Sequence, residues 1–271
     1  MQPKHTPADP TKAIQIADYF RNEVAQGVLK AGDYLPPLDK IGEDWDVNVG
    51  VVREAQTIMK AEGLISTSRG RPAQIRKAPD RIVRDSRRHQ EEKDRVHLDH
   101  EERRVRGAAE VDHGQQLDAL TFVAHYSRMD DLGKRNDLFK MDDKGQLLRR
   151  EYELRDDRKR LAWSVSYIPV SLIEGNPDLL DQDQEPWPGG TMHQLSTVGI
   201  EVAEVIDEVH ARMPTTIETR EWSMEPGVPL LVVRRISIDT RGRVVEVSDA
   251  DYPADRIELR FHTPLTAWKA E

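Results

Sequence analysis

Basic side chains gather in one short stretch of the chain, between positions 69 and 88, where only Asp80 and Asp85 oppose them. Such side chains bind the phosphate oxygens of nucleic acids, and the affinity depends on local positive charge rather than on net charge. The formal net charge of -9 therefore does not exclude a nucleic-acid partner, because the acidic excess lies beyond residue 112. The basic residues of the stretch are Arg69, Arg71, Arg76, Lys77, Arg81, Arg84, Arg87 and Arg88.

A second group of residues has the chemistry of a small-molecule site. Gly189 and Gly190 allow close approach to the backbone, and Thr191 follows them at the expected start of a helix. The free N–H groups and the positive dipole end of a helix favour an anion. The pattern thus predicts a site for an anionic group, although such a glycine pair is more often only a turn, with Thr191 as the helix cap.

Composition excludes several other classes of protein. No apolar run is long enough to cross a bilayer and the first residues form no apolar signal region, so we expect a soluble, cytoplasmic protein. The absence of cysteine excludes disulfides, thiolate zinc sites and a cysteine nucleophile. His97 and His100 lie three residues apart but lack a third ligand, so we expect neither a metal nor a cofactor.

The elements that position the basic stretch follow from apolar spacing and capping residues. Pro36 suits the first turn of a helix, Asn48 is a good N-cap, and Gly63 can end the helix that Asn48 begins. A helix beside a basic hairpin fits a DNA groove and its flanking phosphates. The predicted elements are helices over residues 11–26, 38–44 and 48–63, and wing strands over residues 64–67 and 73–77.

The rest of the chain divides into a charged segment and a larger domain. Residues 77–112 have dense mixed charge and little to bury, which predicts a charged linker or a solvated helix and strand between domains. Beyond them, short apolar stretches alternate with turns, which predicts an α+β fold with a mixed antiparallel sheet. The expected domains are residues 1–76 and 113–271; strands are expected over 147–152, 162–168, 230–238 and 244–247, and helices over 191–198 and 201–212.

Two groups of short motifs are typical of a known family. The first group comprises Ile16-Ala17, Gly32-Asp33, Leu35-Pro36, Val51-Val52-Arg53, residues 61–65 and Gly70. With these motifs, the first 76 residues resemble the winged helix-turn-helix of GntR-type transcription regulators. The second group comprises LLRREYELRDD, WSVSYIP, WPGGTMHQL, GVPLLVVRR and GRVVEVSDADYPADR. With these motifs, the remainder resembles UTRA, the effector-binding domain of the HutC branch, which has a chorismate-lyase-like fold.

The resemblance implies which residues contact DNA. Three positions of this surface depart from the family pattern. Asp39 replaces the usual arginine of the second helix, and Val49 and Val51 replace an arginine and a threonine of the recognition helix. Valine offers only a contact to a thymine methyl group, so we expect an unusual operator or weaker binding. For Arg53 an ion pair with a neighbouring helix is the alternative reading. The implied DNA-binding residues are Lys40, Asn48, Gly50, Arg53, Arg69, Gly70 and Arg71.

The resemblance also implies an effector pocket. Arg150 lies on the strand that supplies ligand arginines in the family and would pair with an anion in a fork geometry. For Arg150 and Glu246 a structural salt bridge is the alternative, and Tyr152 and Ser164 depart from the family pattern. The implied effector-binding residues are Arg150, Tyr167, Gly190, Thr191, Glu246 and Tyr252.

Together these features predict a ligand-responsive transcription regulator. We expect a repressor that binds a double-stranded DNA operator as a homodimer and is released by a small-molecule effector. Two alternatives are a chorismate-lyase-like enzyme and a DNA-binding protein whose C-terminal domain serves only dimerisation. No nucleophile or His–carboxylate pair stands at catalytic spacing, which disfavours the enzyme.

Overall fold

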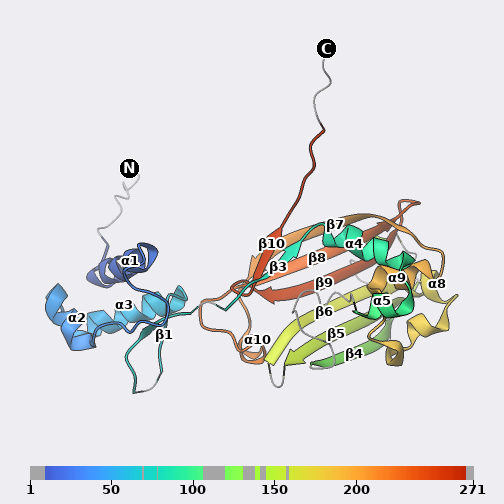
Figure 1. The fold of residues 1–271 in the computed structure, drawn as a ribbon. Coiled ribbons are helices and arrows are strands. Elements are labelled where there is room, and N and C mark those ends of the chain that lie inside the picture. The colour runs from blue at the N-terminus through green and yellow to red at the C-terminus, as the bar shows by residue number, and fades with distance from the viewer. Residues whose placement is uncertain are drawn as a thin grey trace, which may run out of the picture. The chain divides into compact units, whose positions relative to one another are not determined.

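A computed structural model describes residues 10–68, 70–77, 79–105, 120–130, 138–140, 145–156 and 159–266. The chain divides into two compact units (Figure 1). The first unit comprises Met1–Pro79 with Met224–Val228, and the second comprises Asp80–Ser223 with Pro229–Glu271. Within the described ranges, no helix combines the length and apolar character needed to span a membrane.

The first unit is a three-helix domain with a two-stranded wing. Helix α1 (Lys12–Ala25) begins at Thr11, whose Oγ1 accepts a hydrogen bond from the Ile14 backbone N–H. Apolar residues four apart, such as Ile16 and Phe20, bury one face of α1, which packs against α3. The remaining elements are α2 (Leu38–Trp45), α3 (Val49–Ala61), β1 (Ile65–Ser66) and the antiparallel β2 (Gln74–Ile75). The predicted winged helix-turn-helix is confirmed.

The second unit contains a six-stranded sheet in which every pairing is antiparallel, in the order β4-β5-β6-β9-β8-β7. Because alternate residues face opposite sides, one face buries a cluster with Leu148 and Ile168 and the other a cluster with Val165 and Tyr167. The α+β class is confirmed. The strands are β4 (Thr121–Met129), β5 (Leu147–Asp156), β6 (Lys159–Pro169), β7 (Val202–Arg212), β8 (Leu230–Asp239) and β9 (Val244–Pro253).

The helix predicted over residues 201–212 is wrong, because this segment forms β7. Val202, Ile206 and Val209 suit a helical stripe, but the segment pairs along its length with β8. Pairing with a strand distant in sequence overrides the local pattern. The helical elements of this half are α8 (Val170–Ile173), η3 (Pro177–Leu180), η4 (Gln182–Gln184), α9 (Gly190–Ser196) and α10 (Thr216–Glu221).

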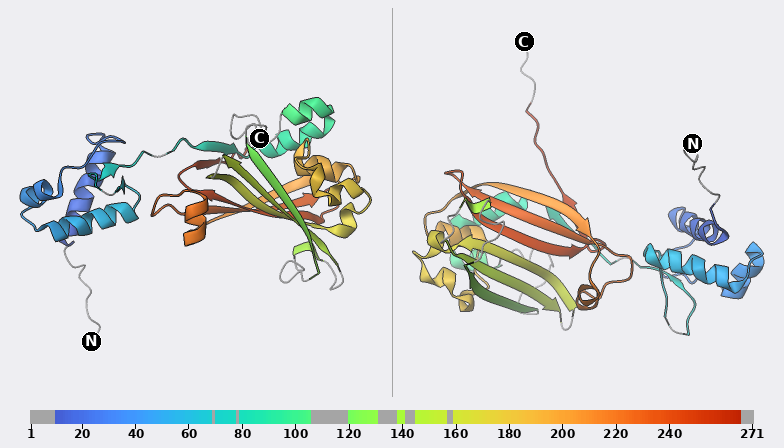
Figure 2. Two further views of the ribbon diagram at one scale, coloured as in Figure 1. Left: turned by 90° about the horizontal axis from the view of Figure 1, so that it is seen from below. Right: turned by 180° about the vertical axis from the view of Figure 1, so that it is seen from behind.

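The charged segment 77–112 contributes several elements to the second unit. Strand β3 (Ile82–Asp85) pairs in parallel with β10 (Ile257–Arg260). Helix α4 (Arg88–Asp94), the 3-10 turn η1 (Arg95–His97) and α5 (His100–Val105) follow. Helices α4 and α5 lie near α9 at one end of the sheet (Figure 2). Charged residues that bury little by themselves are thus fixed by contacts with distant parts of the chain.

Candidate DNA-binding surface and effector site

Asn48 and Gly50 build the first turn of α3. The Asn48 side chain caps the helix, because its Oδ1 accepts a hydrogen bond of 3.2 Å from the Val51 backbone N–H. A Cβ at position 50 would lie 2.8 Å from this oxygen, so Gly50 leaves room for the cap. Both residues are exposed. Each therefore has a structural role beside its predicted DNA contact.

Asn48→Ala is expected to lower the free energy of unfolding by about 1 kcal/mol, the usual effect of losing an N-cap. Urea unfolding followed by circular dichroism measures the change. Asn22→Ala, within α1, is the matched control, since Asn22 provides no cap. An equal loss in both variants would contradict the capping role.

Arg53 is exposed one turn further along α3. Within the described ranges no carboxylate pairs with it, which disfavours the alternative of a structural ion pair. Its guanidinium thus keeps its full hydrogen-bonding capacity for a base edge or a phosphate.

Lys40 on α2 is less available. Its Nζ lies 2.6 Å from Asp44 Oδ1, and the hydrogen bond to Asp44 raises the pKa of Lys40. Asp39 is exposed beside it. Helix α2 therefore offers little net positive charge to DNA.

The wing turn presents Gly70 and Arg71 to solvent. Gly70 has a φ of 77°, a conformation that favours glycine, and the Arg71 backbone N–H donates to the Ser68 carbonyl at 3.2 Å. Arg69 lies outside the described residues. Of the two predicted wing arginines, Arg71 is therefore the one whose exposed position supports the predicted DNA contact.

Arg150 lies in the interior of the second unit and is 1% exposed. Its Nη2 is 3.0 Å from Glu246 Oε1 and also donates to Ser166 Oγ at 2.8 Å. Burial acts to lower the pKa of Arg150, but Tyr152 and Glu246 outweigh it and hold the pKa above its ordinary value. The structural salt bridge, left open by the sequence, is thus present.

Arg150 Nη1 also has a partner, whereas the buried Arg150 Nε has no hydrogen-bond partner among the described residues. Arg150 Nη1 donates to Gln194 Oε1 at 2.6 Å, and Thr191 Oγ1 lies 3.4 Å from Arg150 Nη2. Ser166 and Gln194 were not predicted. The sequence could have indicated Ser166, because the alternation of residues along β6 places it on the same face of the sheet as Arg150.

Glu185 extends this network toward β4 and β5. Its Oε1 accepts hydrogen bonds from Tyr126 Oη at 2.6 Å, Tyr152 Oη at 3.0 Å and Gln194 Nε2 at 2.9 Å. Burial raises the pKa of Tyr126 to about 12. Tyr152, at the position of the family arginine, thus donates to a half-buried carboxylate.

The predicted effector residues do not all meet. Thr191 and Glu246 join Arg150, and Gly190 begins α9 with a φ of 73°. Tyr167 is buried on the opposite face of the sheet, within the cluster of Val165. Tyr252 lies near the other end of β9 from Glu246.

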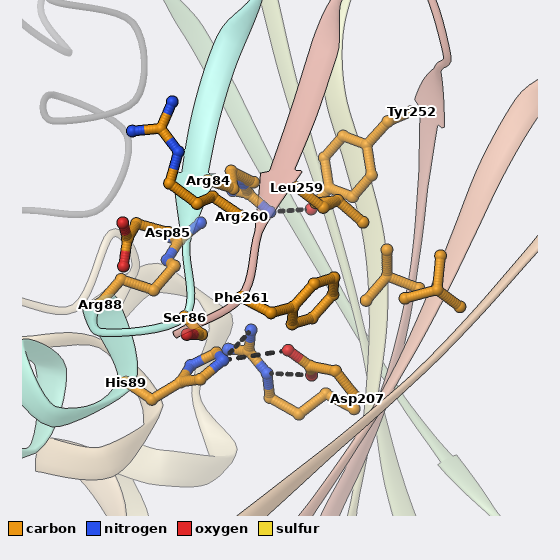
Figure 3. Close-up of a pocket in the computed structure, with 13 residues that line it drawn as sticks. Arg84, Asp85, Ser86, Arg88, His89, Asp207, Tyr252, Leu259, Arg260 and Phe261 are labelled. Atoms are coloured by element: carbon orange, nitrogen blue, oxygen red, sulfur yellow. Dashed lines mark hydrogen bonds and ion pairs between the residues drawn. The ribbon is translucent and has the colours of Figure 1, made fainter. Parts of the chain in front are cut away.

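Tyr252 instead lines a small cavity of about 30 Å³ (Figure 3). Arg84 donates a hydrogen bond to its hydroxyl, and the Arg84 guanidinium carbon lies 4.6 Å from the centre of the tyrosine ring. We call this cavity the arginine pocket, because four arginines and only two carboxylates line it. Its polar lining residues are Arg84, Asp85, Ser86, Arg88, His89, Asp207, Arg235, Tyr252 and Arg260.

Asp207 organises one wall of the arginine pocket (Figure 3). Its Oδ2 lies 3.0 Å from His89 Nε2, and its Oδ1 lies 3.0 Å from Arg235 Nε. Burial acts to raise the pKa of Asp207, but the hydrogen bond with His89 and the charge of Arg235 outweigh it and hold the pKa well below its usual range. The carboxylate thus fixes α4 to β7 and β8.

Asp207→Asn is expected to destabilise the chain by about 1 kcal/mol at neutral pH, because the amide keeps only one acceptor. The folded pKa is lowered, so the stabilisation is complete well above the ordinary value of 3.8 and is lost as the pH falls below it. Urea unfolding at about pH 7 and about pH 3 tests this. A difference between variant and wild type that stays constant over this range would contradict the assignment.

Two family models match the chain. The model for bacterial regulatory proteins of the gntR family matches residues 12–75, and the UTRA domain model matches residues 136–258. An uncharacterized HTH-type transcriptional regulator of Rhizobium meliloti (strain 1021) is 24% identical over 92% of this chain and 93% of its own length. The Uxu operon regulator of Haemophilus influenzae (strain ATCC 51907 / DSM 11121 / KW20 / Rd) is 28% identical over 25% of this chain and 26% of its own.

Solved structures have the same fold. A crystal structure of a GntR-family transcriptional regulator has a TM-score of 0.66 at 23% identity and covers 95% of this chain and 99% of that one. The structure of PhnF from Mycobacterium smegmatis has a TM-score of 0.50 at 16% identity, and the match covers 94% of this chain and 100% of that one.

The domains and the relatives indicate a regulator that binds DNA and not an enzyme. The order of the two domains is consistent with the HutC type. With an N-terminal winged helix-turn-helix and a C-terminal UTRA domain, the chain belongs to the GntR family of transcription regulators.

Proposed function

We propose that the chain is a repressor whose homodimer binds an operator and leaves it when a small-molecule effector binds. DNA binding is supported chiefly by the position of Arg53. This residue is exposed near the start of the capped helix α3 and has no carboxylate partner among the described residues. One winged domain reads a half-site, so paired half-sites require two-fold protein symmetry. The proposed contacts come from Lys40, Asn48, Gly50, Arg53, Arg69, Gly70 and Arg71.

The effector half of the proposal concerns residues 113–271 and an anionic ligand. Arg150 is already paired with Glu246, so an anion that used Arg150 would have to displace a buried carboxylate. The arginine pocket has more cations than anions and includes Tyr252. We therefore assign the anionic group of the ligand to the arginine pocket. Thr191 and Glu246 belong instead to the Arg150 cluster, and Gly190 is the residue before Thr191. Tyr167 stays a weaker candidate, because it is buried on the other face.

The segment 77–112 receives a role in the same proposal. Strand β3 begins five residues after Lys77 and supplies Arg84 and Asp85 to the arginine pocket. We assign residues 1–76 to the DNA-binding domain and treat 77–112 as the connection through which effector binding reaches it. The switch operates only if the effector binds one arrangement of the dimer more tightly than the other.

Genomic selection of bound fragments tests the proposal. Sheared genomic DNA is incubated with the full chain, and bound fragments are sequenced; we expect a short two-fold symmetric motif. Light scattering should then give the mass of a dimer, and metabolites related to neighbouring genes should release the DNA. Recovery of unrelated fragments, or a monomer on the selected DNA, would contradict the proposal.

A further inference from the structure

A second cavity of the second unit is lined by residues of the α4–η1 segment and of the α9–β7 segment. Helices α4 and α9 lie side by side at one end of the sheet (Figure 1). Its volume of about 350 Å³ falls within the range of small-molecule sites. None of its lining residues belongs to the arginine pocket or to the Arg150 cluster. The two pockets share the elements α4 and β7 but no residue: α4 gives Arg88 and His89 to one and Lys93 to the other, and β7 gives Asp207 to one and Val202 to the other.

The floor of this cavity is apolar. Met192, Ile200 and Val202 form it, and each is 5–7% exposed. Val96, on η1, adds an apolar wall. Burying a ligand's hydrocarbon against such side chains is favourable, because it removes apolar surface from water.

The rim of the cavity has one cation paired with one carboxylate. Lys93 Nζ lies 2.7 Å from Glu201 Oε1, and the hydrogen bond to Lys93 together with its charge lowers the pKa of Glu201. Glu201 is largely exposed, with 64% of its side chain accessible, so it can leave Lys93 to solvent without a burial penalty.

We propose that this cavity binds a small apolar carboxylate, such as a medium-chain fatty acid or an aromatic acid. The hydrocarbon lies on Met192, Ile200 and Val202, and the carboxylate takes the place of Glu201 at Lys93. An uncharged apolar ligand would make no ion pair with Lys93, and a short polar acid would leave the floor exposed to water. This site is distinct from the proposed effector site and does not depend on it.

Isothermal titration calorimetry of the full chain with octanoate tests the inference. We expect saturable binding of octanoate, roughly tenfold weaker binding of hexanoate because two methylenes are lost, and no detectable binding of acetate. Octanol should bind more weakly than octanoate. Equal affinity for octanol would overturn the assignment of a carboxylate ligand, and absence of octanoate binding would overturn the site.

Two variants locate the binding. Val96→Trp fills the cavity and should abolish octanoate binding, whereas Val123→Trp, on exposed β4, should leave it unchanged. Lys93→Met should weaken octanoate roughly tenfold without weakening octanol, since one charge-assisted contact is lost; Lys30→Met is its control in the first unit. Unchanged octanoate affinity in Lys93→Met would overturn the proposal even if Val96→Trp failed to fold.

Discussion

Arg150→Met is expected to lower the free energy of unfolding by about 3–5 kcal/mol. The variant leaves Glu246 as a buried carboxylate without its cation, and it also removes the donors to Ser166 and Gln194. A charge in this position cannot be solvated, because Glu246 is 6% exposed. Urea unfolding followed by tryptophan fluorescence measures the loss, since Trp163 and Trp222 lie in the second unit.

Arg149→Met is the matched control for this prediction. Arg149 is the next residue on β5, but it faces the other side of the sheet and pairs with the partly exposed Glu151. Its loss should cost about 1 kcal/mol or less. The double variant Arg150→Met, Glu246→Met should recover much of the stability, because it leaves no unpaired buried charge. Equal losses from the two single variants would contradict the buried ion pair.

Arg53→Ala is expected to weaken operator binding by about 1–3 kcal/mol, provided that Arg53 makes a bidentate contact to a base. The Arg53 side chain is exposed near the start of α3. Within the described ranges it pairs with no carboxylate, so its removal leaves no charge without a partner. The loss should therefore appear in DNA affinity and not in the free energy of unfolding. Fluorescence anisotropy with a labelled operator duplex measures it.

Arg21→Ala provides the control on the same unit. Arg21 lies on α1, where it pairs with Asp18 and Glu62, so its guanidinium is already engaged. We expect its removal to change operator affinity much less than the removal of Arg53. If the two alanine variants bind the operator equally well, Arg53 does not contact the duplex.

The winged helix-turn-helix was predictable because its signals are local. Asn48 caps α3 as predicted, and the apolar spacing of Ile16 and Phe20 places α1 against the core. Such signals need only a few neighbouring residues, so they survive without knowledge of the rest of the fold. The same reasoning found four strands of the large sheet.

Features that depend on distant pairing were missed. Strand β3 pairs with β10, at the far end of the chain, and β7 becomes a strand only through β8. The side to which a residue points also depends on register, which places Ser166 rather than Tyr167 beside Arg150. The arginine pocket was not predicted, since β3, α4, β7, β8, β9 and β10 all contribute to it.

The salt dependence of operator binding tests the central claim most directly: that a locally basic surface on an acidic chain binds duplex DNA. Anisotropy titrations from about 50 mM to about 200 mM salt should show log affinity falling linearly with log salt concentration, as counterions leave the phosphates. Arg71→Ala should make this slope less steep by roughly the amount that one phosphate contact contributes. Affinity that is independent of salt in both proteins would contradict the account.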